Sequence, residues 1–160
     1  MLSKILELQD LIKVVHDLRE LGKKIVFTNG CFDILHVGHV RYLTAARSEG
    51  DILVVGLNSD GSVKSIKPEN RPIVNQEQRA EVLAGLECVD FITVFNEPDP
   101  LKVINELKPD VLVKGADWIE KEIIGADIVK ANGGKVVRVS VVPEVSTSRI
   151  IQRIAKRYQH

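Results

Sequence analysis

The sequence has no excess of charge of either sign, few cysteines and no long apolar run. Its 160 residues carry 22 lysines and arginines against 22 aspartates and glutamates, so the formal net charge is zero. This balance argues against nucleic acid as the main partner, because such proteins usually show a basic excess. Two cysteines cannot form a disulfide framework, and no apolar run approaches the ~20 residues that span a bilayer. No signal segment opens the chain. We therefore expect a reduced, cytoplasmic protein with no membrane partner.

The composition is that of one globular domain. Hydrophobic residues make up 44% of the chain and charged residues 28%, which is enough for a buried core. A length of 160 residues suits one domain better than two. No internal repeat, low-complexity segment or linker divides the sequence. We expect a single domain over residues 1–160.

Short apolar runs alternate with segments of helical periodicity along the chain. The runs predict five buried strands, at Lys24–Thr28, Ile52–Leu57, Phe91–Val94, Val111–Val113 and Val136–Val142. The predicted helices are Ile5–Leu21, Val37–Ser48, Gln76–Leu86, Pro98–Leu107, Glu120–Ala131 and Ser146–Tyr158. The polar stretch Asn58–Pro72 predicts a loop. Strands without polar alternation are typical of a parallel sheet covered on both faces. The expected fold class is α/β, a doubly wound parallel sheet.

Polar clusters follow four of the predicted strands directly. They are Asn29–His39, Asn58–Arg71, Lys114–Trp118 and Ser146–Arg149. In doubly wound sheets, ligands bind beyond the carboxyl ends of the strands, where the strand order reverses. We therefore expect the four clusters to meet at one edge of the sheet and to form a single site.

The most informative cluster contains two histidines three residues apart at the start of a helix. With four histidines and 11 glycines in the chain, a His-x-Gly-His string arises by chance in fewer than about 1% of such sequences. His36 and His39 would present imidazoles to a phosphate, and Gly38 would let the ligand approach the backbone of a helix N-terminus. The alternative is that both histidines are capping or surface residues. Neither a P-loop nor a dinucleotide fingerprint occurs in the sequence.

This segment resembles the His-x-Gly-His signature of the nucleotidyltransferase superfamily, which includes cytidylyltransferases and small adenylyltransferases. Longer strings are similar to the nucleotidyltransferase half of bacterial ADP-heptose synthases, at Phe27–Asp33, Gly56–Asp60, Pro109–Gly115 and Ser146–Ser148. The resemblance implies a Rossmann-like nucleotidyltransferase fold. It also implies attack by D-glycero-β-D-manno-heptose 1-phosphate on the α-phosphorus of ATP. The products would be ADP-heptose, for lipopolysaccharide or surface glycan synthesis, and pyrophosphate.

The resemblance also implies roles for individual residues. His36 and His39 would be catalytic, with Lys64 as a clamp on the triphosphate and Lys67 as a weaker candidate. The residues expected to bind nucleotide or phosphate are Asn29, Gly30, Cys31, Phe32, Asp33, Gly38, Arg71, Arg79, Lys114, Gly115, Asp117, Ser146, Thr147 and Ser148. Asn58 and Trp118 are candidates for binding the acceptor substrate.

Ordinary structural roles remain open for several of these residues. Asp33 could cap the following turn, Lys64 could be a solvated side chain, and Trp118 could occupy a core position. Arg71 and Arg79 could form ion pairs with Glu77 or Glu81. An N-cap could lie within Ser146–Ser148, and Cys31 and Cys88 could serve as small apolar packing residues.

The family resemblance carries further expectations about ligands and partners. Mg²⁺ is expected to arrive with ATP, because no cluster of carboxylates indicates a dedicated metal site. We also expect a homo-oligomer and a separate sugar kinase that supplies the sugar 1-phosphate. Two alternatives remain, a cytidylyltransferase acting on glycerol 3-phosphate and a nucleotide-binding module without turnover. The first is weakened because cytidylyltransferase relatives carry an arginine just upstream of the string that corresponds to Ser146–Ser148. No arginine occurs in Val142–Ser148.

Overall fold

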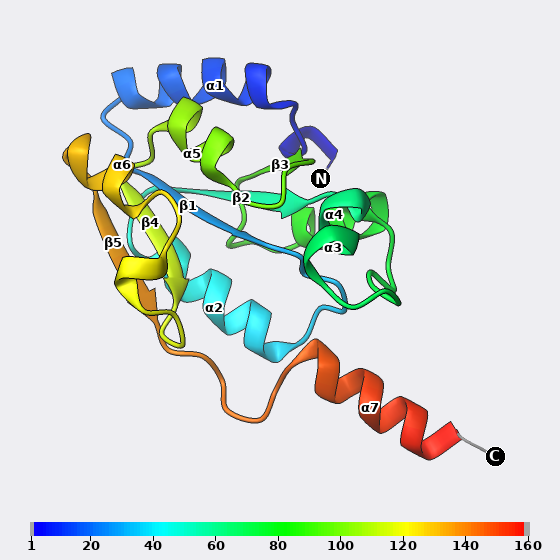
Figure 1. The fold of residues 1–160 in the computed structure, drawn as a ribbon. Helices are drawn as coiled ribbons and strands as arrows, with labels where there is room; N and C mark the ends of the chain where they lie inside the picture. The colour runs from blue at the N-terminus through cyan, green and yellow to red at the C-terminus, as the bar shows by residue number, and fades with distance from the viewer. Residues whose placement is uncertain (1, 159–160) are drawn as a thin grey trace.

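A computed structural model describes residues 2–158, so Met1 and residues 159–160 of the expected domain lie outside the described part. Its centre is one sheet of five parallel strands in the order β3-β2-β1-β4-β5 (Figure 1). The strands are β1 (Ile25–Gly30), β2 (Ile52–Asn58), β3 (Phe91–Phe95), β4 (Val111–Gly115) and β5 (Lys135–Val139). The α/β doubly wound parallel sheet predicted from the unbroken apolar runs is thereby confirmed.

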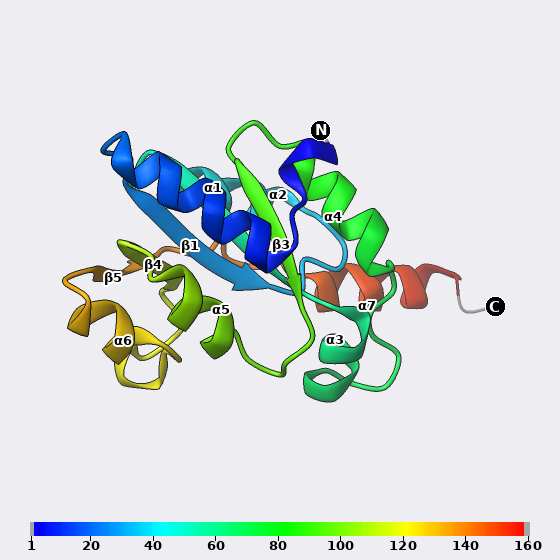
Figure 2. The same cartoon turned by 90° about the horizontal axis from the view of Figure 1, so that it is seen from above.

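Helices cover both faces of the sheet, as Figure 2 shows from above. The α-helices are α1 (Leu8–Glu20), α2 (Val37–Arg47), α3 (Asp60–Ile66), α4 (Gln76–Ala84), α5 (Leu101–Leu107), α6 (Ala126–Ala131) and α7 (Thr147–Tyr158), and the short 3-10 helices are η1 (Leu2–Lys4) and η2 (Glu120–Glu122). Helices α2 and α4 pack on one face, while α1, α5 and α6 pack on the other. Helix α7 extends away from the sheet (Figure 1). None of the helices within residues 2–158 is both long and apolar enough to cross a bilayer.

Alternate residues of each central strand belong to two separate hydrophobic cores. On β1, Val26 packs with α2 and α4, whereas Phe27 packs with α1 and α5. On β4, Val113 lies in the first core and Leu112 in the second. This is the two-residue alternation of a strand buried on both sides. It determines the face on which each polar residue at a strand end lies.

The strand order reverses beside β1, which has β2 on one side and β4 on the other. The crossover that leaves β1 runs to β2 on one side, whereas the chain reaches β4 on the other side from β3, so a crevice is left between them at the carboxyl edge. The polar clusters singled out in the sequence follow β1, β2, β4 and β5 at this same edge.

The predicted loop Asn58–Pro72 is wrong over part of its length, because residues Asp60–Ile66 form α3. Ser59 caps this helix by accepting a hydrogen bond at Oγ from the Ser62 N–H. Val63 anchors it, since its side chain is fully buried. Seven residues with one buried apolar side chain give too weak a periodic signal to be recognised from sequence.

Three other element predictions need correction. The expected helix Glu120–Ala131 is divided into η2 and α6 by Gly125, which has a φ of +85° that a continuous helix does not tolerate. The expected helix Pro98–Leu107 begins only at Leu101, with Pro100 as its N-cap residue. The last strand ends at Val139, before the predicted Val142.

Candidate active site

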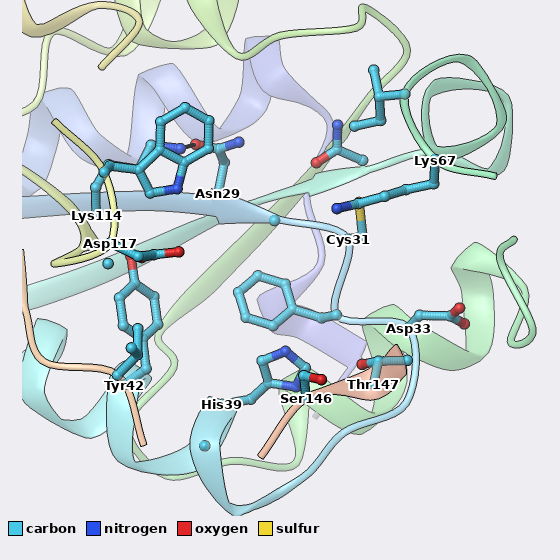
Figure 3. Close-up of a pocket in the computed structure, with 18 of the residues that line it drawn as sticks. Asn29, Cys31, Asp33, His39, Tyr42, Lys67, Lys114, Asp117, Ser146 and Thr147 are labelled. Atoms are coloured by element: carbon cyan, nitrogen blue, oxygen red, sulfur yellow. Dashed lines mark hydrogen bonds between the residues drawn. The ribbon is translucent and has the colours of Figure 1, made fainter. Parts of the chain in front are cut away.

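A cavity of about 590 Å³ opens at the carboxyl edge of the sheet. Figure 3 shows side chains from distant parts of the chain around it. Most of the residues selected from the sequence line this cavity, namely Asn29, Gly30, Cys31, Phe32, Asp33, His36, Gly38, His39, Asn58, Arg71, Lys114, Gly115, Asp117, Trp118, Ser146, Thr147 and Ser148. Lys64 and Arg79 do not. The expected meeting of four clusters at one edge is confirmed.

The turn that leaves β1 brings its backbone close to the cavity. Phe32 has a left-handed φ of +44°, which reverses the chain directly after the strand. A Cβ atom on Gly30 would lie 2.9 Å from the Phe32 ring, so only glycine fits beneath that ring. Burial raises the pKa of the neighbouring Cys31 thiol, which therefore remains protonated near neutral pH.

The two histidines stack on each other at the beginning of α2. The centroids of the His36 and His39 rings are 3.8 Å apart with an interplanar angle of 18°, and the Phe32 ring meets His39 edge-on at 5.1 Å. Neither buried Nδ1 atom has a hydrogen-bond partner within residues 2–158. Unpaired polar atoms of this kind are costly unless a ligand uses the group. The surface-residue alternative for the pair does not fit this arrangement.

Burial sets the protonation of this pair. It lowers the pKa of His36, and burial together with the neighbouring His36 lowers the pKa of His39 to about 4. Both rings are therefore neutral at pH 7 in the free protein. An anion bound beside the rings would raise both pKa values again.

Gly38 lies between the histidines and allows their close approach. A Cβ atom at this position would lie 3.0 Å from two atoms of the His36 ring. Such a contact is tighter than side chains normally make, so the ring would have to move. Gly38 is therefore needed for the position of His36 as well as for access to the helix backbone.

Asp33 and Arg71 fasten the segment between α3 and α4 to the β1 turn. The buried Asp33 carboxylate accepts hydrogen bonds from the backbone N–H groups of Ile73 and Val74 and from Arg71 Nε, at 2.5–3.0 Å. These hydrogen bonds overcome the effect of burial and lower the pKa of Asp33. Asp33 therefore binds a distant segment of the chain instead of capping the turn that follows it, and Arg71 pairs with Asp33 rather than with Glu77 or Glu81.

Arg79 is a fully buried structural residue and is not positioned to hold a phosphate. Its Nε donates to the Val74 carbonyl, and its Nη1 donates to the carbonyls of Cys31 and Asn58. Nη2 forms an ion pair with Asp60 at 2.8 Å. The predicted pairing with Glu77 or Glu81 is absent from the described residues, and these four partners occupy all three guanidinium nitrogens. Instead, Arg79 joins the ends of β1 and β2 to the starts of α3 and α4.

The two candidate clamp lysines are placed in the reverse of the expected order. Lys64 is exposed on α3 and does not line the cavity. Lys67, the weaker candidate in the sequence, follows the end of α3 and lines it (Figure 3). The difference arises because Asp60–Ile66 is helical, which fixes the direction of each side chain.

Lys114 carries a positive charge to the other side of the cavity. Its Nζ donates a hydrogen bond to Asn29 Oδ1 and lies 5.6 Å from the centroid of the Trp118 ring. Burial lowers the pKa of Lys114 to about 8, so the ammonium is largely retained at pH 7. Trp118 is 46% exposed, which rules out the core position left open for it.

Tyr42 also lines the cavity, although sequence reasoning missed it. Its hydroxyl lies 2.7 Å from Thr28 Oγ1 and donates to the Val113 carbonyl, and burial raises its pKa to about 12. Its position three residues after His39 on α2 places both on one helix face, which was the available signal. The other lining residues missed are Ile66, Pro98, Asp99, Pro100, Ile123, Ile124, Val141, Val142 and Val145.

The N-terminus of α7 lies at the cavity as the sequence predicted. Ser146 Oγ accepts a hydrogen bond from the Arg149 N–H, and Thr147 Oγ1 donates to the Ile34 carbonyl. The capping role left open for Ser146 is therefore present. The start of this helix can still attract an anion, because its other backbone N–H groups and its dipole point toward the cavity.

No group of three or more His, Cys, Asp or Glu side chains within residues 2–158 could hold a metal ion. Asp117 and Asp99 line the cavity, but they follow different strands, β4 and β3. Oxygen ligands from a bound triphosphate would have to complete any magnesium site here.

Comparison with known proteins agrees with this geometry. Residues 27–153 match the cytidylyltransferase-like family. The bifunctional protein HldE of Citrifermentans bemidjiense is 51% identical over 156 residues, covering 98% of this chain and 32% of that protein. HldE of Geobacter metallireducens is 49% identical with the same coverage. The chain thus spans about a third of the length of these relatives.

A solved structure supports the same assignment. The lipopolysaccharide core biosynthesis protein from Thermoplasma volcanium superposes with a TM-score of 0.63 at 31% sequence identity. The match covers 76% of this chain and 98% of that one. Since the family match extends from β1 into α7 and includes the stacked histidines, this chain belongs to the cytidylyltransferase-like family.

Proposed function

We propose that this protein transfers the adenylyl group of ATP to D-glycero-β-D-manno-heptose 1-phosphate, giving ADP-heptose and pyrophosphate. The observation that carries the reaction type is the stacked pair of His36 and His39 at the start of α2, with two unpaired Nδ1 atoms in the cavity wall. The choice of substrates is supported by the strings resembling ADP-heptose synthases and by the HldE relatives. The neighbouring structure, a lipopolysaccharide core biosynthesis protein, fits a role in surface glycan synthesis.

The reaction is a single displacement at phosphorus. A phosphate oxygen of the sugar 1-phosphate forms a bond to the α-phosphorus of ATP, the bond from that phosphorus to the bridging oxygen breaks, and pyrophosphate leaves with the electron pair. No covalent enzyme intermediate is needed. The protein contributes positioning and stabilisation of the negative charge that develops on the phosphate oxygens.

The histidines and two helix N-termini supply this stabilisation. Neutral imidazoles avoid repulsion between stacked cations in the free protein, and an arriving triphosphate would raise their pKa values. Each ring would then donate a hydrogen bond to a phosphate oxygen. The starts of α2 and α7 add backbone N–H groups and partial positive charge on the same side of the cavity. Lys67 would add a full charge from the segment after α3.

Magnesium is proposed to enter bound to ATP. The described residues provide no three-ligand cluster, whereas Asp117 in the cavity wall could contact a metal held by the triphosphate. The ion would neutralise phosphate charge. A separate sugar kinase as the source of the sugar 1-phosphate, a homo-oligomeric assembly and a cytoplasmic location are further parts of this proposal.

The test is pyrophosphate release across a grid of four nucleoside triphosphates and several sugar or polyol phosphates. The highest kcat/KM is expected for ATP with the heptose 1-phosphate, and a folded His39→Ala variant serves as the inactive control. A higher kcat/KM for CTP with glycerol 3-phosphate would replace the substrate assignment and keep the chemistry. No release for any pair, from protein that binds ATP, would reject enzymatic turnover in favour of a nucleotide-binding module.

A further inference from the structure

The strand ends divide the cavity between the two faces of the sheet. On β4, Val111 and Val113 pack in the core with α2, and Leu112 packs in the core with α5. Lys114 comes next, so strand alternation places its side chain on the Leu112 face. Lys114 therefore lies on the side of the sheet opposite to the helix that carries the histidines.

Two asparagines lie on the same face as Lys114. Asn29 is two residues beyond Phe27 on β1, and Asn58 is four residues beyond Val54 on β2; both apolar residues belong to the α5 core. The hydrogen bond from Lys114 to Asn29 agrees with this placement. Asn58 donates through Nδ2 to Ser62 Oγ, and its Oδ1 has no protein partner within residues 2–158.

Figure 3 shows the separation directly. Lys114 and Asn29 lie on one side of the β1 ribbon, whereas Tyr42, His39 and Ser146 lie on the other. We name the part of the cavity around Lys114 the Lys114 lobe, and of the residues that line the cavity we assign to it Asn29, Asn58, Asp99, Lys114 and Trp118. The two helix N-termini that suit a triphosphate lie on the histidine side.

The Lys114 lobe has the chemistry of a site for a phosphorylated polyol. The partners of the Lys114 ammonium are a neutral amide oxygen and the Trp118 ring, and no carboxylate pairs with it among the described residues. A partly buried cation without a counter-charge favours an anionic ligand. Amide and carboxylate oxygens such as those of Asn58 and Asp99 are the usual acceptors for sugar hydroxyls.

We infer that the Lys114 lobe binds the acceptor sugar 1-phosphate, with the Lys114 ammonium contacting its phosphate and Asn58 and Asp99 binding its hydroxyls. This assignment rests on the proposed adenylyl transfer. It gives Lys114 and Asn29 a role in binding the acceptor, whereas the family resemblance implied that they bind the nucleotide. One phosphate oxygen would contact Lys114 while another attacks the α-phosphorus from the face opposite the departing pyrophosphate. Lys114 takes no part in proton transfer and acts as a specificity residue.

The experiment compares two variants that remove the cation in different ways. Lys114→Met keeps the side-chain volume without the charge, and Asn29→Asp leaves the lysine in place but gives it a carboxylate partner. Both should raise the KM for D-glycero-β-D-manno-heptose 1-phosphate by about 10–100-fold, as expected for a lost charge-assisted contact. The Kd for ATP, measured by calorimetry without acceptor, should change less than about twofold. Lys102→Met, at an exposed position on α5 outside the cavity, is the matched control.

The outcomes separate this inference from the proposed function. Wild-type protein that releases no pyrophosphate with the heptose 1-phosphate, and does not bind it, rejects the proposed function and this assignment with it. Active wild-type protein whose two variants bind ATP more weakly, with an unchanged acceptor KM, rejects the Lys114 assignment alone. Circular dichroism of each variant checks folding. Should Lys114→Met not fold, the nearly isosteric Asn29→Asp variant decides the question.

Discussion

Replacing Arg79 by methionine should destabilise the protein without a direct effect on ligand binding. The substitution keeps an unbranched apolar side chain and removes the guanidinium. It leaves the carbonyls of Val74, Cys31 and Asn58 without their donor and Asp60 without its ion-pair partner. Each buried acceptor left unpaired costs about 1–3 kcal/mol, but such costs are not additive.

The expected loss is about 3–5 kcal/mol, the range seen when one member of a buried ion pair is removed. For a domain of this size, 1 kcal/mol corresponds to about 2–4 °C in Tm, so Tm should fall by about 6–20 °C. Urea unfolding followed by circular dichroism gives the free energy directly. Arg157→Met, at an exposed position on α7, should change it by less than about 0.5 kcal/mol.

The two roles considered for Arg79 give opposite results. A structural residue lowers stability and leaves the Kd for ATP near the wild-type value at a temperature where the variant is folded. Wild-type stability combined with an ATP affinity reduced tenfold or more would refute the structural reasoning. It would return Arg79 to the phosphate-binding role that its sequence position indicated.

Three further predictions concern the cavity. His39→Ala should lower kcat by at least about 10²-fold in a folded protein, because a donor to the transferring phosphate is lost; pyrophosphate release at the wild-type rate would exclude this role. His39 should also make stability depend on pH. Its pKa of about 4 in the folded state lies below the ordinary 6.5, so the unfolded chain binds the extra proton between these values. The free energy of unfolding therefore has its full value with respect to His39 above pH 6.5. It decreases by up to ~3 kcal/mol as the pH falls toward 4. Urea titrations at pH 7 and pH 4.5 should therefore differ less for His39→Gln than for the wild type. Finally, Lys67→Ala should reduce kcat/KM for ATP about tenfold or more, with Lys64→Ala close to wild type; equal effects in steady-state kinetics would contradict the placement of α3.

The sequence was sufficient for the strands and for the histidine site because both depend on short-range patterns. Apolar runs mark the five strands, and His-x-Gly-His lies within four residues. The role of Arg79 was beyond such reasoning, since it depends on Cys31 and Asn58, which are 48 and 21 residues away. Both candidate partners considered for it lay on its own helix.

Other site residues were missed for identifiable reasons. Asp99 follows β3 at the same sheet edge as the other clusters, but one aspartate between two prolines forms no recognisable motif. The directions of Lys64 and Lys67 could not be predicted from sequence, because the short helix α3 depends on the Ser59 cap and one buried valine. Helices this short are decided by tertiary packing rather than by propensity.

Alternation along the strands has a consequence for how substrate preference could change. Residues 113 and 114 of β4 are adjacent in the chain, yet they lie against different helical layers. Substitutions on opposite faces of a sheet share few contacts, so their free-energy effects should be nearly additive. Preference for the nucleotide and preference for the acceptor could therefore diverge separately among descendants of one gene, one substitution at a time. An inserted or deleted residue within β1 or β4 would act differently, because a shift of one position exchanges the two faces and alters both preferences together.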